Sequence, residues 1–117
     1  MTLFFFQLAR GAENAFARDP NTTLIKLRQL AEVIAKQIAT YCAIEFDEQT
    51  TQADLLYRIN KELTVNPAIL DLFHYLRIEG NKAAYQYTTS HKIALNALKV
   101  ALSMAIWFHQ SFGVNYC

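Results

Sequence analysis

Apolar residues recur along most of the chain with the three- and four-residue spacing of an amphipathic α-helix. The clearest case lies between residues 20 and 41, where the apolar positions are Leu24, Leu27, Ala31, Ile34, Ile38 and Tyr41. On another face of this segment, Arg28, Glu32 and Lys36 stand four residues apart, which is typical of a solvated ladder of ion pairs. No stretch of any length alternates apolar and polar residues as a β-strand would.

The same periodicity, together with residues that favour helix ends, predicts four further helices. The five expected helices span residues 4–17, 20–41, 52–63, 67–84 and 90–112. Asp19 before Pro20 and Asn66 before Pro67 are typical of helix starts, because the first residue caps free amides and proline lacks one. Thr51 should cap the third helix, Thr89 or Ser90 the last, and Gly113 should end it.

Five helices without strands predict an all-α fold, a single five-helix bundle. The last helix is apolar on most of its faces, so we expect it to be central and the most buried. Its apolar residues are Ile93, Ala97, Leu98, Val100, Ala101, Met104, Ile106, Trp107 and Phe108. The polar residues 85–89 should form the loop before it.

Composition supports a folded domain and excludes several classes of protein. The 117 residues are 53% hydrophobic and 18% charged, which excludes intrinsic disorder and allows a core without disulfides or metal. Two cysteines, Cys42 and Cys117, make no disulfide framework and no zinc site, which favours a reducing, cytoplasmic compartment. We expect Cys42 to be a buried, inert thiol.

Charge gives no strong sign of a nucleic-acid partner, because the net charge is only +1. Residues 45–79 carry seven acidic and three basic side chains, whereas residues 80–117 carry three lysines and no acid. Either region could face a partner, but solvated faces of an ordinary domain are the preferred interpretation. The short apolar N-terminus is no signal peptide, and polar interruptions make residues 93–112 a core helix rather than a membrane span. We expect residues 1–117 to be a single helical domain, an N-terminal fragment of a much longer chain.

Candidate catalytic groups are scarce. Gly11 and Gly80 are isolated, so no phosphate-binding loop exists. The histidines His74, His91 and His109 have no partners at metal-ligand spacing. The threonines at positions 22, 23, 50 and 51 lie where helix-capping residues are expected. We therefore expect no catalytic residue, cofactor or metal in this chain.

One segment, residues 73–85, combines polar and small residues in an unusual way. In a helix, Arg77, Asn81 and Tyr85 would lie four residues apart on one face, beside a small surface that includes Gly80. This face, made by Arg77, Gly80, Asn81 and Tyr85, is called the signature face below. It is either a polar site or a helix crossing in which Arg77 satisfies buried groups, with Glu32 or Asp71 as its ion-pair partner.

Residues 76–84 read LRIEGNKAA and resemble the LRxxGNxAxH signature of a helical domain of uncharacterised function in the HEPN-like superfamily. Residues 19–26, DPNTTLIK, followed by Glu32 and Ala35-Lys36, resemble the N-terminus of the R (HsdR) subunit of type I restriction enzymes of the enteric K family. Residues 73–77 and the late AIWF at 105–108 fit the same template.

The resemblance implies a HEPN-like bundle at the N-terminus of an ATP-dependent DNA translocase and endonuclease. Such a subunit acts with methylation and specificity subunits on duplex DNA and requires ATP and Mg²⁺, whose ligands would lie beyond this chain. The resemblance therefore implies a non-catalytic assembly or docking module. Two alternatives are a HEPN-like RNA-binding or degenerate RNase module and a structural cap on a nuclease domain. Tyr85 replaces the signature histidine, and a neutral phenol is a poor base near pH 7.

Overall fold

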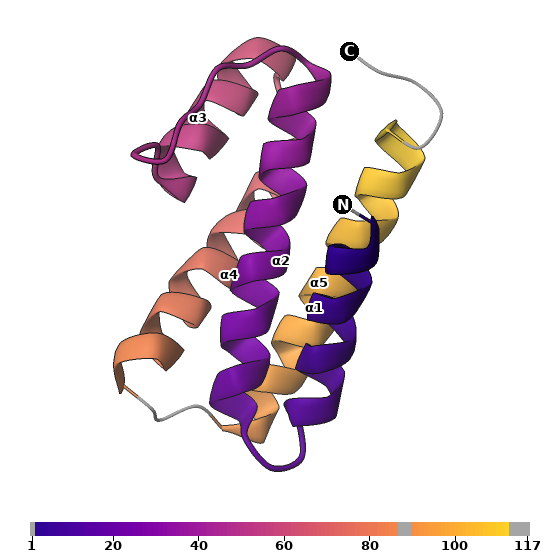
Figure 1. Ribbon diagram of the computed structural model, residues 1–117, viewed down its shortest axis with the longest axis vertical. Coiled ribbons are helices and arrows are strands. Elements are labelled where there is room, and N and C mark those ends of the chain that lie inside the picture. The colour runs from indigo at the N-terminus through magenta and orange to yellow at the C-terminus, as the bar shows by residue number, and fades with distance from the viewer. Residues whose placement is uncertain (1, 87–89, 113–117) are drawn as a thin grey trace.

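The computed structural model describes residues 2–86 and 90–112, and all of its regular structure is helical. The helices are α1 (Thr2–Ala15), α2 (Pro20–Tyr41), α3 (Gln52–Leu63), α4 (Pro67–Gln86) and α5 (His91–Phe112) (Figure 1). The described residues contain no strand, so the prediction of an all-α, five-helix fold is confirmed. No described helix is both long enough and apolar enough to span a membrane.

The centre of the bundle is α2, which contacts each of the other four helices. Ten of its 22 residues are buried, whereas α5 has five buried residues in the same length. The expectation that the C-terminal helix is central was therefore wrong. Apolar residues on several faces of α5 do reach the core, but others point to solvent, so the near-uniform pattern of α5 did not indicate its position.

Local capping chemistry places the starts of α2 to α5 at, or within one residue of, the positions that the sequence predicts. The carboxylate of Asp19 accepts a hydrogen bond from the Thr22 amide, and the Thr51 hydroxyl accepts one from the Asp54 amide at 3.1 Å. Asn66 and Ser90 do the same for the amides of Ala68 and Ile93. These side chains satisfy amides that have no partner inside their helices.

Helix ends agree less well with the sequence expectations. The first helix begins at Thr2 and ends at Ala15, two residues earlier than expected at both ends. The fourth continues to Gln86, so Tyr85 is helical and not part of a loop. The expected cap Thr89 and stop Gly113 lie outside the described residues. Helix ends depend on few contacts, and apolar periodicity locates them poorly.

Two buried polar side chains of α2 bind neighbouring helices. The hydroxyl of Thr23, fully buried, donates to the carbonyl oxygen of Ala12 on α1 at 2.8 Å. The amide of Asn21 donates to the carbonyl of Ala83 on α4 at 3.3 Å. Thr23 is therefore not a capping residue, as its position near the helix start suggested. These bonds satisfy the buried groups and hold α1 and α4 against the start of α2.

The predicted ion-pair ladder on α2 is not formed. Arg28 is half-buried beneath α4, and among the described residues the one ion pair within 4 Å joins Lys82 and Glu79, at 3.6 Å. The i, i+4 spacing of Arg28, Glu32 and Lys36 placed them on one face, but α4 covers part of that face.

Candidate functional site

The signature face lies where α4 crosses α2. Gly80 is buried at this crossing, and a Cβ atom at position 80 would lie 2.4 Å from the Cβ of Arg28 and 3.0 Å from its Cγ. Real Cβ atoms do not approach other carbon atoms so closely. The absence of a side chain at Gly80 therefore allows α4 to pass directly over the stem of Arg28.

Asn81 binds the guanidinium group of the same arginine. The Nη1 of Arg28 donates to the Oδ1 of Asn81 at 3.1 Å. The Nε of Arg28 is buried and has no hydrogen-bond partner among the described residues. Arg28 therefore belongs to this site, although the sequence did not indicate it. Its four-residue spacing from Glu32 and Lys36 predicted a solvated position.

Arg77 contacts a histidine instead of an acid. Its Nε donates to the Nδ1 of His74, one helical turn earlier, at 3.3 Å. Partial burial lowers the pKa of His74 below its usual 6.5, the nearby Arg77 charge lowers it further, and Asp71 opposes the shift. Nδ1 can accept this bond only in a neutral ring. Within the described chain neither Glu32 nor Asp71 forms the expected ion pair with Arg77.

Tyr85 is separate from these contacts. Its side chain is 84% exposed at the end of α4. The four signature residues therefore share a helix but do not converge on one cavity: Gly80 and Asn81 contact Arg28, Arg77 contacts His74, and Tyr85 faces solvent.

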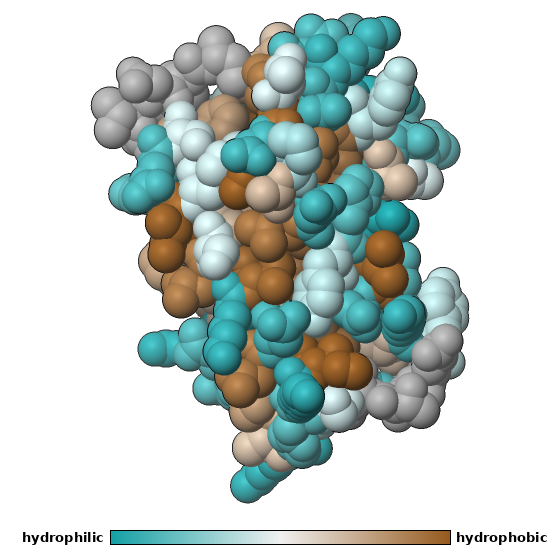
Figure 2. Space-filling model, turned by 180° about the vertical axis from the view of Figure 1, so that it is seen from behind, coloured by the Kyte–Doolittle hydropathy of each residue, from teal (hydrophilic) through white to brown (hydrophobic). Residues whose placement is uncertain are grey.

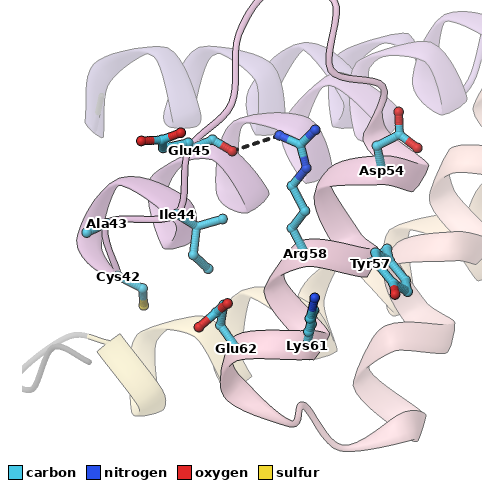
Figure 3. Close-up of a pocket in the computed structure, with 9 residues that line it drawn as sticks. All are labelled: Cys42, Ala43, Ile44, Glu45, Asp54, Tyr57, Arg58, Lys61 and Glu62. Carbon is cyan, nitrogen blue, oxygen red and sulfur yellow. Dashed lines mark hydrogen bonds between the residues drawn. The ribbon is translucent and has the colours of Figure 1, made fainter.

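A large hollow lies elsewhere, between the end of α2, the loop after it and α3 (Figure 3). It is open, has a volume of about 820 Å³ and is lined by side chains of both charges. The charged lining residues are Glu45, Asp54, Arg58, Lys61 and Glu62. The guanidinium of Arg58 reaches across it and donates from Nη1 to the carbonyl oxygen of Glu45 at 2.9 Å (Figure 3). This bond connects α3 to the loop, so the arginine has a structural role here.

Cys42 also lines this hollow, at the C-cap of α2. It is half-buried and is not a free thiol, so the expectation of a buried, inert thiol was wrong. Cys117 lies outside the described residues.

The described residues contain no group of three or more His, Cys, Asp or Glu side chains that could hold a metal ion. The three histidines stand apart. His74 contacts Arg77, the Nε2 of His91 lies 2.9 Å from the carbonyl oxygen of Ala17, and His109 is exposed on α5.

Comparison with known proteins finds one informative relative. No protein-family model and no solved structure matches the chain. Over 113 residues, 97% of its length, the chain is 35% identical to the endonuclease subunit of the type I restriction enzyme EcoKI from Escherichia coli strain K12. The chain spans only 10% of the length of that subunit. This similarity supports a relationship between the chain and one small part of a type I restriction endonuclease subunit.

Proposed function

We propose that this chain is a non-catalytic assembly or docking module of the motor-endonuclease subunit of a type I restriction-modification enzyme. The observation that carries the proposal is the 35% identity over nearly the whole chain to the EcoKI endonuclease subunit. A segment that matches one tenth of such a subunit is a domain-sized part of it. The larger protein would cleave DNA after ATP-driven translocation, in the cytoplasm.

The contacts of the signature face support a structural role for it. Gly80 and Asn81 receive Arg28 from the neighbouring helix, and Arg77 binds His74 on its own helix. Three of the four residues, Gly80, Asn81 and Arg77, thus have a partner within the fold, whereas Tyr85 is exposed. ATP and Mg²⁺ would be bound by other parts of the full-length protein, and methylation and specificity subunits would be the partners of this module.

A HEPN-like module that binds or cleaves RNA is the second candidate, because Arg77 and Asn81 are close together and both partly accessible. Two observations make it weaker. The ring nitrogen nearest Arg77 belongs to His74 and is already engaged, and Tyr85 stands at the signature histidine position. The third candidate is a structural cap on a nuclease domain. Like the docking role, it requires an exposed surface that another domain can contact.

Subunit binding by the isolated chain tests the proposal. The tagged chain is mixed with purified methylation and specificity subunits of the same restriction system, and binding is measured by calorimetry and co-elution. We expect a stable complex with one of them and no cleavage of duplex DNA when ATP and Mg²⁺ are added. The variant Ala101→Asp, which should unfold the core, controls for capture that does not require the fold. A folded chain that binds neither subunit would reject the docking role.

A further inference from the structure

The outer face of α5 carries an exposed seam with the spacing of a helix-pairing surface. Its members follow one another at alternating intervals of three and four residues, and are Lys92, Leu95, Lys99, Leu102 and Ile106. All five are exposed, and the three apolar ones are 44%, 62% and 49% exposed in chain order. Viewed from behind, the molecule shows apolar residues at the surface across its middle and toward the side of α5 (Figure 2).

The spacing indicates what shape of partner this seam fits. Residues at alternating three- and four-residue intervals form the seam along which two helices pair. Other residues of α5 already bury its opposite face against the bundle: Ala94, Ala97, Ala101 and Met104. Leu102 and Ile106 are therefore not needed for the core, and a second helix could pack along the seam without displacing any element described here.

The charge along the seam indicates the chemistry of that partner. Lys92 and Lys99 stand on either side of Leu95, and residues 90–112 contain no Asp or Glu. An approaching helix with acidic residues beside its apolar positions would meet unpaired cations of opposite sign. A second copy of this chain fits poorly, because a two-fold pairing centred on the seam would bring the two Lys99 side chains together. An anionic membrane is also less suited, because the aromatic residues of α5, Trp107, Phe108 and Phe112, are turned toward the bundle.

We infer that the α5 seam is a docking surface for an acidic amphipathic helix of a partner protein. This inference rests on the proposed docking role and adds the surface and the chemistry of the segment that binds it. The apolar contact comes from Leu95, Leu102 and Ile106. Lys99 lies between Leu95 and Leu102 along the seam and selects for acidic flanking residues on the partner helix.

Two designed helical peptides of equal length test the inference directly. They share one leucine seam and differ only in flanking residues, which are all Glu in one and all Lys in the other. We expect the full chain to bind the Glu peptide at least about tenfold more tightly than the Lys peptide, measured by fluorescence anisotropy. Lys99→Glu should reverse this preference, and Leu102→Gln with Ile106→Gln should weaken binding of the Glu peptide at least about tenfold.

A matched control uses Ile78→Gln, which removes an exposed isoleucine from α4, outside the seam, and should leave binding unchanged. Circular dichroism checks that each variant is folded. The inference is overturned if neither peptide binds, if the Lys99→Glu change leaves the preference as it was, or if the seam variants bind like the parent. It is also overturned if sedimentation shows the chain dimerising through this seam, or if only vesicles of equal phosphatidylglycerol and phosphatidylcholine bind it.

Failure of this inference is distinguishable from failure of the proposed function. If the chain binds a methylation or specificity subunit but no peptide, and the seam variants bind that subunit equally well, the docking role stands and the α5 surface is rejected. If the Glu peptide binds through Lys99 while both subunits fail to bind, the surface stands and the restriction-enzyme partner is rejected.

Discussion

Gly80 is the residue on which the crossing of α4 over α2 depends. Replacing it with alanine places a methyl group 2.4 Å from the Cβ of Arg28, which is too close for either helix to keep its position. We expect Gly80→Ala to lower the free energy of unfolding by about 1–3 kcal/mol through overpacking. Urea denaturation followed by circular dichroism measures the change.

Gly11 provides the matched control, because it also lies within a helix. A Cβ there would meet only the Lys26 side chain, at an ordinary 3.5 Å. Gly11→Ala should therefore raise the free energy of unfolding by up to about 1 kcal/mol, the difference in helix propensity between the two residues. Equal effects of the two substitutions would contradict the close packing assigned to Gly80.

His74 should make the stability of the domain depend on pH. Its pKa in the folded chain is lowered from the usual 6.5 by partial burial and by Arg77, so the unfolded chain binds a proton more readily. The stabilising contribution of the neutral ring is complete above about pH 6.5 and is lost as the pH falls below that value. We expect the melting temperature of the parent to fall between about pH 7.5 and pH 5 more steeply than that of His74→Gln. Parallel pH profiles for the two proteins would show that His74 does not contribute.

At the scale of elements, α5 has one buried face and one exposed face. Substitutions at two neighbouring positions can test the two faces separately. Ala101 is 5% exposed and Leu102 is 62% exposed. Ala101→Asp should place an unpaired carboxylate in the core and cost about 3 kcal/mol or more, enough to unfold a marginally stable domain. Leu102→Asp should cost less than about 1 kcal/mol. The comparison requires only thermal melts, and an Ala101→Asp protein that melts like the parent would contradict the assigned packing of α5.

The elements themselves were largely predictable, but their arrangement was not. Capping side chains act over three residues, so Asp19, Thr51, Asn66 and Ser90 could be recognised from neighbours in the chain. In contrast, the bond between Arg28 and Asn81 joins residues 53 positions apart. No local pattern distinguishes an arginine that faces solvent from one that another helix covers, which is why Arg28 was assigned to the wrong surroundings.

At the scale of the whole molecule, the nearly balanced charge predicts weak contact with DNA. The net charge is +1, and the region without acids has only three lysines among residues 80–117. Few phosphates can be neutralised, so we expect binding of the isolated chain to a fluorescent duplex to disappear near about 0.15 M salt. Submicromolar, sequence-specific binding under those conditions would show that the chain itself reads DNA.

The RNase alternative is tested at Tyr85. Because this side chain is 84% exposed, Tyr85→His should leave the melting temperature unchanged. We expect neither the parent nor this variant to cleave single-stranded RNA, with or without Mg²⁺, because Arg77 and Asn81 already have partners in the fold. If the single change produces cleavage, the signature face is a lapsed active site and its structural role is secondary.

The sequence by itself determined the helical class, the number of helices and most of their starts, since periodicity and capping act between residues close in the chain. It also carried the similarity to a restriction endonuclease subunit. Only the tertiary structure decided that α2 is the central helix, that Gly80 and Asn81 receive Arg28, and that the outer face of α5 stays exposed. The physical reason is that the surroundings of an apolar or charged side chain depend on which helix packs over it. That choice depends on how all five helices share a limited core, which no single helix specifies.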